Sequence, residues 1–162
     1  MRSFRIEPFA VPHDAREPIG LVIESDSGHR VGVVTDVGRR TVGMWKKLRT
    51  LDALIVEANH DVEMLRSGPY PWRLKERIAG GRGHLSNEEA GRGVRELLDT
   101  SLRTVVLYHL SDTNNLPALA EQAVVSELER AGSTIDLHVS QQHEPTPWVE
   151  FGVEQATDAA GG

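Results

Sequence analysis

The 162-residue sequence predicts an α/β fold in which helices and a sheet form layers. Three observations lead to this class. Short β-branched runs occupy the chain up to residue 35, two apolar runs of strand length follow at 51–57 and 105–109, and amphipathic stretches lie between and after them. Strands that alternate with helices favour a layered architecture over an all-α or all-β one. The length favours a single domain with one modest core.

The first part of the chain is expected to form strands and one short helix. The first segment alternates apolar and polar residues, and the turn signal Ser27-Gly28 separates the next two runs. A short amphipathic helix then leads into the buried strand LDALIVE. The expected strands are Phe4–Val11, Leu21–Ser25, Val31–Thr35 and Leu51–Glu57, and the expected helix is Thr41–Arg49.

The second part of the chain is expected to be richer in helices. Pro71 suits the first turn of a helix that stops at Gly80-Gly81, and Ser86 suits the N-cap of the next helix. Pro117 and Gly132 bracket a longer helix. That helix is expected at Leu116–Ala131, two strands are expected at Val105–His109 and Ile135–Val139, and residues 156–162 are expected to form a disordered tail.

Composition narrows the chemistry. The net charge of -6 and the pI near 5.6 argue against a surface that binds nucleic acid throughout, but they permit a local basic patch. Because the chain has no cysteine, a metal ion would be held by His and carboxylate groups. No segment approaches the roughly 18 apolar residues of a membrane span, and Met1-Arg2-Ser3-Phe4 does not begin an apolar signal segment. We therefore expect a cytoplasmic protein that does not bind membranes.

Histidines and aspartates fall where the expected strands end. In open α/β sheets, the loops at the carboxyl ends of the strands gather ligands and substrates. Imidazoles and a carboxylate that converge on one point are suited to a divalent metal hydrolase. The candidates are His13, Asp36, His60, Asp61, His84 and His109.

Each candidate also has an ordinary explanation. A lone histidine at a strand end is more often a surface or hydrogen-bonded residue than a ligand, and an aspartate near a glycine is frequently a turn former. Glu57 is open to interpretation as a paired general acid or as a solvated strand terminus. Four asparagines near the candidates could orient ligands or contact phosphate, or could be turn residues: Asn59, Asn87, Asn114 and Asn115.

A basic stretch precedes His84. Its side chains could contact backbone phosphates, which would make binding sensitive to salt, or they could form a solvated helix face. The residues are Arg73, Lys75, Arg77 and Arg82.

Several uncommon strings occur together and in order. They include Val56–Asp61 (VEANHD), Gly68–Trp72 (GPYPW), Gly83–Asn87 (GHLSN) and His109-Leu110-Ser111, with His13-Asp14-Ala15 upstream. Together they resemble the YycJ/WalJ-like branch of the metallo-β-lactamase-fold hydrolases. The resemblance extends from about Phe4 to Val139.

The resemblance implies a fold and a set of site residues. Residues 1–155 would be the C-terminal portion of a metallo-β-lactamase αββα sandwich. His13 and His109 would be metal ligands and Asp36 the bridging carboxylate, while Glu57 and His84 would be catalytic as a proton-transfer pair. Four further residues would lie around the metal site or contact substrate: His60, Asp61, Asn87 and Asn115.

The resemblance also implies an activity, and one departure from the family pattern limits it. The complete domain would hold two divalent ions, zinc or manganese, and would hydrolyse DNA or RNA through a metal-bridging hydroxide. The family's HxHxDH motif is absent from the sequence, so this chain would need an N-terminal half, in cis or in trans. The alternatives are a hydrolase of small esters or thioesters and a metal-free interaction module that would associate in solution. The chain could also form a homo-oligomer.

Overall fold

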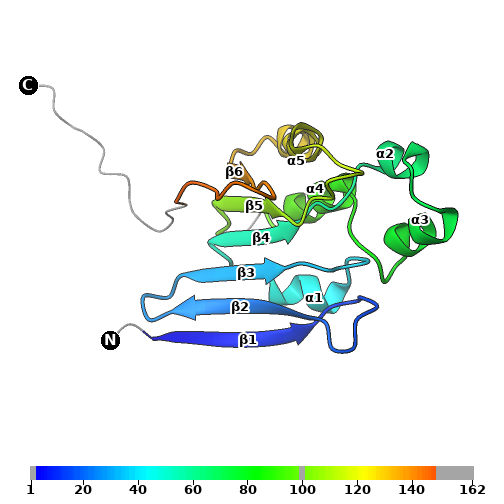
Figure 1. Cartoon of the computed structure of the whole chain (residues 1–162). Helices are drawn as coiled ribbons and strands as arrows, with labels where there is room; N and C mark the ends of the chain where they lie inside the picture. The colour runs from blue at the N-terminus through cyan, green and yellow to red at the C-terminus, as the bar shows by residue number, and fades with distance from the viewer. Residues whose placement is uncertain (1–2, 99–100, 149–162) are drawn as a thin grey trace, which may run out of the picture.

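The computed structural model describes residues 3–98 and 101–148, which form one six-stranded mixed sheet with flanking helices (Figure 1). This confirms the predicted class. Within those residues no helix is both long and apolar enough to cross a bilayer. The strands are β1 (Phe4–Ala10), β2 (Ile19–Ser25), β3 (Arg30–Val34), β4 (Ala53–Glu57), β5 (Thr104–Tyr108) and β6 (Asp136–Val139). The helices are α1 (Val42–Lys47), α2 (Val62–Ser67), α3 (Trp72–Ala79), α4 (Asn87–Arg95) and α5 (Pro117–Ala131).

The strands lie in the sheet in chain order, and the topology changes at β3. β1, β2 and β3 pair antiparallel, whereas β3, β4, β5 and β6 pair parallel. Each parallel connection passes through at least one helix, as parallel pairing requires. The carboxyl ends of β3, β4 and β5 therefore lie at one edge of the sheet, on the side where α2 and α3 stand in Figure 1.

One face of the sheet forms the core with α1, α4 and α5. The parallel strands are rich in Val and Leu, and Val34, Val56 and Leu107 are fully buried on this face. Gly32 in β3 lets the next layer approach, because a methyl group there would lie 2.5 Å from a Leu51 methyl carbon. One layer of helices therefore buries this face, and the strand ends that carry the candidate site project from a packed core.

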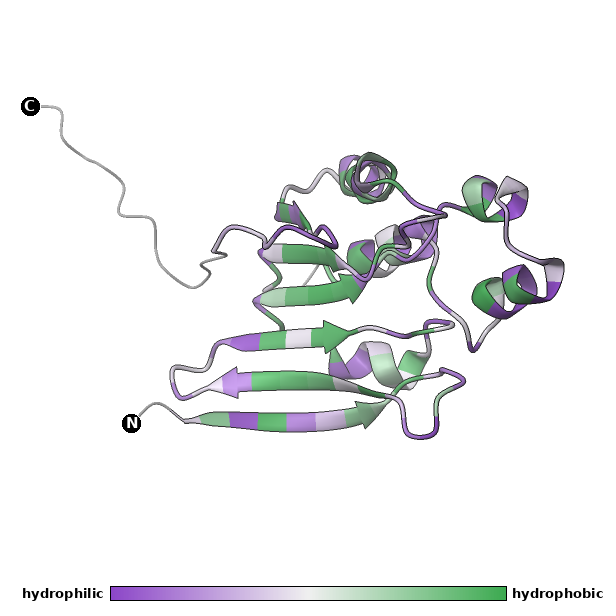
Figure 2. Ribbon diagram, in the orientation of Figure 1, coloured by the Kyte–Doolittle hydropathy of each residue, from purple (hydrophilic) through white to green (hydrophobic). Residues whose placement is uncertain are grey.

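The opposite face of the sheet is less covered. Apolar colour runs along β4 and β5 in Figure 2, and the outward side chains of the central strands are only half-buried. A groove of about 930 Å³ lies between this face and residues 140–148. The outward apolar residues of the sheet include Leu21, Ile23, Val31, Val33, Ile55 and Val106.

Ser86 and Gly132 stand at helix ends as expected, whereas Thr41, expected as the first residue of a helix, is the N-cap of α1. The side chains of Thr41 and Ser86 accept backbone N–H bonds at the starts of α1 and α4, and Gly132 ends α5 with a φ of 61°. The sequence did not predict α2, because six residues are too few for a helical period. The available signal was Asp61, whose side chain caps α2. The predicted tail at 156–162 lies outside the described residues.

Candidate metal centre

Five polar side chains meet at the edge where the parallel strands end. Asp36 follows β3, Glu57 is the last residue of β4, and His109 follows β5. His13 comes from the connection between β1 and β2, and His84 from the loop between α3 and α4. The structure thus brings together the three predicted ligands and the predicted proton-transfer pair. We call these five residues the His/Asp/Glu cluster.

Glu57 is the buried hub of the cluster. Its Oε1 accepts the backbone N–H groups of Val37 at 2.7 Å and Leu85 at 2.9 Å, and its Oε2 accepts that of Asp36 at 3.0 Å. The Nδ1 atoms of His84 and His109 lie 3.1 and 3.2 Å from Oε2. One carboxylate, with no exposed surface, therefore fastens three loops to the end of β4.

The contacts of Glu57 decide its charge. Burial on its own raises the pKa of this carboxyl, but the hydrogen bonds from His109, His84 and the Leu85 N–H outweigh burial and lower the pKa to about 2. Glu57 is therefore ionised at neutral pH and can only accept hydrogen bonds. It follows that the Nδ1 atoms of both histidines carry protons toward it. The hydrogen bond to Glu57 in turn raises the pKa of His109.

Three imidazoles surround Asp36, and one of them presents a free ring nitrogen to it at a distance suited to a shared ion. His13 Nε2, His84 Nδ1 and His109 Nδ1 lie 3.6, 3.8 and 3.9 Å from Asp36 Oδ1. These distances are too long for hydrogen bonds. The Nδ1 atoms of His84 and His109 donate to Glu57, so Nε2 is the ring nitrogen that each of them has left for a metal. The His13 Nε2–Asp36 Oδ1 distance of 3.6 Å is close to the separation of about 3.4 Å between two ligand atoms that each lie about 2.1 Å from one tetrahedral ion. The His13–Asp36 pair therefore fits a divalent cation.

His13 is oriented as metal-ligating histidines usually are. Its Nδ1 lies 2.9 Å from the carbonyl oxygen of Gly83, which can only accept, so Nδ1 donates and Nε2 is left for a metal. Gly83 is required there, because a methyl group added to it would lie 2.1 Å from the carbonyl oxygen of Ile78. Sequence analysis did not identify this role of Gly83. The string Gly81-Arg82-Gly83-His84 was the available signal.

Two residues of the cluster have strained backbones. Asp36 and His109 adopt φ values of 56° and 59°, in the left-handed region that non-glycine residues seldom occupy. Each stands directly after a parallel strand or one residue beyond it. Strain of this kind costs about 1 to 3 kcal/mol per residue and concentrates at functional sites. A third such residue, Thr50, lies outside the cluster.

Two possible sets of metal ligands overlap in the cluster. Candidate ligand atoms of Asp36, Glu57, His84 and His109 lie within 4.8 Å of one another. The resemblance indicated His13, Asp36 and His109 instead. Five protein groups already occupy the Glu57 oxygens, so this carboxylate has little capacity for an ion. His13 presents Nε2 to Asp36. The set with His13 is therefore the better match to a metal.

The four other predicted site residues lie beside or behind the cluster. Asp61 caps α2, and the amides of Asn87 and Asn115 exchange hydrogen bonds of 2.8 and 2.9 Å. His60 is buried, and its Nδ1 has no hydrogen-bond partner in the described part of the chain. Burial lowers the pKa of His60, which favours its neutral form. Asn59 donates to the carbonyl oxygen of His109 at 3.0 Å and so supports its backbone conformation.

The chain is an α/β protein. Imidazoles and carboxylates at the carboxyl ends of its parallel strands form a candidate metal centre. The family model described as a beta-lactamase superfamily domain matches residues 1–110, and the chain belongs to this family. Its relatives place it in the metallo-β-lactamase superfamily, in agreement with the resemblance seen in the sequence.

The relatives include two exodeoxyribonucleases. One, named YycJ, from Bacillus anthracis, is 34% identical over 148 residues, which cover 89% of this chain and 56% of that protein. Another, named WalJ, from Streptococcus pneumoniae serotype 2, is 40% identical over 136 residues, 83% of this chain and 50% of that protein. The chain thus spans about half the length of the curated relatives it matches.

A solved structure supports the fold. The metallo-beta-lactamase fold protein YhfI from Bacillus subtilis superposes with a TM-score of 0.60 at 17% identity. The match covers 85% of this chain and 47% of YhfI.

Proposed function

We propose that this chain supplies part of the metal centre of a metal-dependent phosphodiesterase that hydrolyses DNA. The observation that carries the proposal is the convergence of three imidazoles on Asp36 at the carboxyl edge of the parallel strands. Its likeness to two exodeoxyribonucleases supports DNA as the substrate.

His13, Asp36 and His109 would hold the ions. Neutral imidazoles and a carboxylate suit zinc or manganese. Such ions, when bound, stabilise charge on phosphoryl oxygens and provide a nucleophile from water near neutral pH. Two ions would need more ligands than these three residues offer. We therefore propose that a second segment, in cis or in trans, completes the centre.

The outer face of the sheet supports a partner of that kind. Its half-buried apolar side chains, such as Ile23, Val33 and Ile55, would interdigitate with a second sheet packed face to face. A second copy of this chain would be the competing occupant. Such a face, left uncovered, is expected to promote association.

Glu57 and His84 would have different roles. Glu57 is fully buried and ionised, so we propose that it is a positioning residue that orients His84 and His109. The side chain of His84 is 20% exposed and its Nδ1 is held by Glu57, which leaves Nε2 to donate a proton to the leaving oxygen.

The test is metal content and DNA hydrolysis, measured on the purified chain alone and mixed with the N-terminal half of a full-length relative. We expect stoichiometric metal and activity only in the mixture. About two ions bound by the chain alone would contradict the assignment of the ligands. An absence of metal and activity in both samples would contradict the hydrolase and favour an interaction module. Faster turnover of a thioester than of DNA would favour an ester hydrolase.

Variants sharpen the same test. Asp36→Asn and His109→Ala should lower the metal content of the mixture and abolish hydrolysis. His29→Ala is the matched control, because His29 precedes β3 whereas Asp36 follows it, so the two residues lie at opposite ends of the strand. Equal metal loss in the His29 variant would argue against a specific centre.

A further inference from the structure

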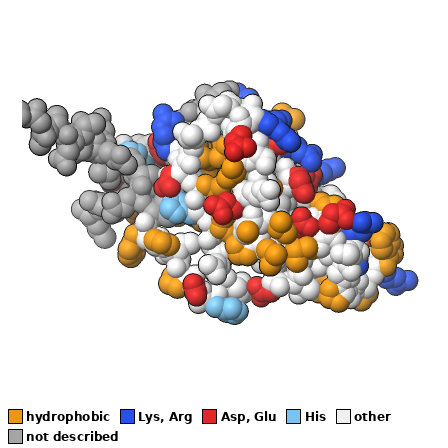
Figure 3. All heavy atoms as spheres, turned by 90° about the horizontal axis from the view of Figure 1, so that it is seen from above, with side chains coloured by type: hydrophobic (Ala, Val, Ile, Leu, Met, Phe, Trp, Pro, Cys, Tyr) orange, Lys and Arg blue, Asp and Glu red, His pale blue; other side chains and the backbone are white. Residues whose placement is uncertain are grey.

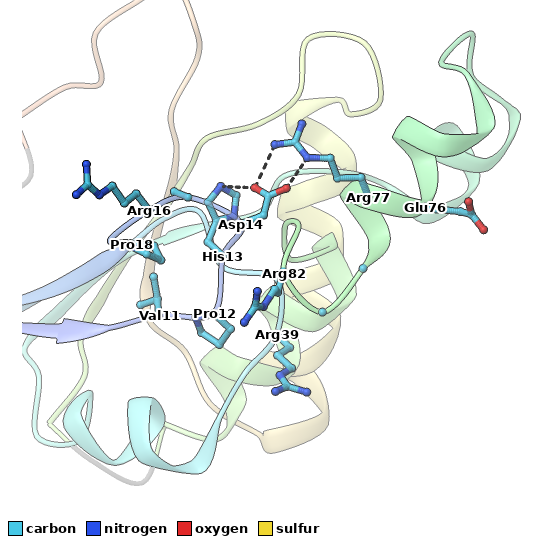
Figure 4. A pocket seen from close by; sticks show the side chains of 13 residues that line it. Val11, Pro12, His13, Asp14, Arg16, Pro18, Arg39, Glu76, Arg77 and Arg82 are labelled. Carbon is cyan, nitrogen blue, oxygen red and sulfur yellow. Dashed lines mark hydrogen bonds and ion pairs between the residues drawn. The ribbon is translucent and has the colours of Figure 1, made fainter.

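A basic cleft opens beside His13. It has a volume of about 760 Å³ and is formed by the β1–β2 connection, the loop after β3, and α3 with the loop that follows it (Figure 4). Four arginines and two carboxylates lie in its wall: Arg16, Arg39, Arg77, Arg82, Asp14 and Glu76. In this net acidic protein, acidic groups are mixed with the basic ones on the surface seen in Figure 3. The local charge of the cleft therefore indicates a ligand more directly than the net charge of the chain does.

The charges in the cleft are not equivalent. Arg77 donates to both carboxylate oxygens of Asp14, and this hydrogen bond lowers the pKa of Asp14. Glu76 points away from His13 in Figure 4. Arg39 and Arg82 are exposed and form no ion pair or side-chain hydrogen bond within residues 3–98 and 101–148. Arg16 is likewise exposed and unpaired among the described residues, but it points away from His13 in Figure 4. Three guanidinium groups of the cleft thus lack a counter-charge, and two of them, Arg39 and Arg82, lie on the loops that carry Asp36 and His84.

Backbone packing holds Arg39 and Arg82 near each other and near the His/Asp/Glu cluster. Gly38 packs against the backbone of Arg82, since a methyl group at Gly38 would lie 2.3 Å from the Arg82 nitrogen. A methyl group at Gly81 would lie 3.4 Å from Arg39 Cδ. Asp36 and His84 are each within three residues of one of these arginines. Their positions are therefore tied to that of the cluster.

We infer that Arg39 and Arg82 form a phosphate-binding subsite for DNA, which takes a backbone phosphate next to the one that is cleaved. This inference rests on the proposed function. Guanidinium groups present planar pairs of N–H donors that match phosphate oxygens. Contacts to backbone phosphate position a strand without reading its sequence. The subsite would thus guide any DNA sequence past His13.

The four basic residues that precede His84 in the sequence have different surroundings in the structure. Arg82 lines the cleft, Arg77 is paired with Asp14, and Lys75 donates to the carbonyl oxygen of Arg66. Arg73 is exposed on α3 and does not line the cleft. Arg73 is therefore a matched arginine control for Arg39 and Arg82.

The test measures binding of a fluorescein-labelled single-stranded DNA 20-mer by fluorescence anisotropy in EDTA across a salt series. Because no metal or cleavage is needed, the result is independent of the proposed hydrolysis. Each phosphate contact contributes about 0.7 to the slope of log affinity against log salt for single strands. Because the subsite takes one phosphate, the R39A/R82A variant should lose about 0.7 of that slope. Between about 50 and 200 mM salt, its affinity should fall about 2.6-fold less than that of the unsubstituted chain.

The control fixes the interpretation. Arg73→Ala should retain the slope and affinity of the unsubstituted chain, and the melting temperatures of all three proteins should agree. Equal losses in R73A and R39A/R82A would overturn the subsite in favour of general charge, as would an unchanged slope in R39A/R82A. Failure of the unsubstituted chain to bind at low salt would also overturn it. Displacement of the DNA by inorganic phosphate at equal molar concentration would show a site for small phosphates instead.

Discussion

The two ends of the parallel strands have similar residues but different hydrogen bonding. At the amino ends, Asp52 Oδ2 accepts the Arg30 N–H at 2.7 Å, and the Asp52 carbonyl oxygen accepts the Arg103 N–H at 2.9 Å. At the carboxyl ends, Asp36 faces imidazole nitrogens at 3.6 to 3.9 Å, beyond hydrogen-bond range. At the amino ends one imidazole nitrogen, His29 Nδ1, lies at a similar distance of 3.8 Å from Asp52. A single such approach therefore does not identify a site. The carboxyl ends differ because three imidazoles surround one carboxylate there.

The largest expected effect is at Glu57, which supports the carboxyl end. In Glu57→Gln, one of the two carboxylate oxygens becomes an NH₂ group, and each position faces backbone N–H donors. The buried NH₂ group of glutamine would then face a backbone N–H group, and both would be donors. The negative charge that faces His84 and His109 would also be lost. We expect the free energy of unfolding to fall by about 3 to 5 kcal/mol. Urea denaturation at pH 7 in EDTA measures it. A loss below about 1 kcal/mol would show that Glu57 is not the hub.

Acid should weaken the same end. The pKa of Glu57 is about 2 in the folded chain and 4.5 as its ordinary value, so the folded state binds this proton less tightly. The stabilisation is fully present above pH 4.5 and is lost as the pH falls toward 2. From about pH 5 to about pH 3 we expect Glu57 to account for a loss of about 2 kcal/mol. The difference between the chain and its Glu57→Gln variant isolates this loss from that of other carboxyls. Parallel stability curves for the two proteins would contradict it.

The sequence allowed most of the fold to be predicted because its signals are local. Thr41, Ser86 and Gly132 mark helix ends, and the Val-rich runs of β3, β4 and β5 mark buried strands. The short helix α2 was not predicted. One turn and a half of helix carries too little periodicity.

Sequence signals were weaker for the relations between distant segments in the site. The positions of Asp36 and His109 at strand ends placed them at one edge. Three features depend on loops far apart in the chain: the five hydrogen bonds to Glu57, the hydrogen bond from His13 to the Gly83 carbonyl oxygen, and the packing of the Arg39 loop against the Arg82 loop. Only the folded geometry shows these contacts.

A smaller effect is expected at the amino ends. Asp52→Ala removes the acceptor of the half-buried Arg30 N–H, which should lower the free energy of unfolding by about 1 kcal/mol. Metal content in the mixture with the N-terminal half should not change, because Asp52 lies at the opposite end of β4 from Glu57. Urea denaturation and metal analysis check both statements. A loss of metal here would remove the distinction between the two ends.

The smallest expected effect separates strain from ligation at Asp36. Asp36→Gly and Asp36→Ala both remove the carboxylate and keep the backbone N–H that Glu57 accepts. Alanine retains a Cβ at a φ of 56° and glycine does not, so the glycine variant should be more stable by about 1 kcal/mol. At Asp52, which has no positive φ, the same pair should have the opposite order, because glycine gains more entropy on unfolding. Equal stability of the two Asp36 variants would show that this backbone holds no strain and that only its carboxylate distinguishes the carboxyl end.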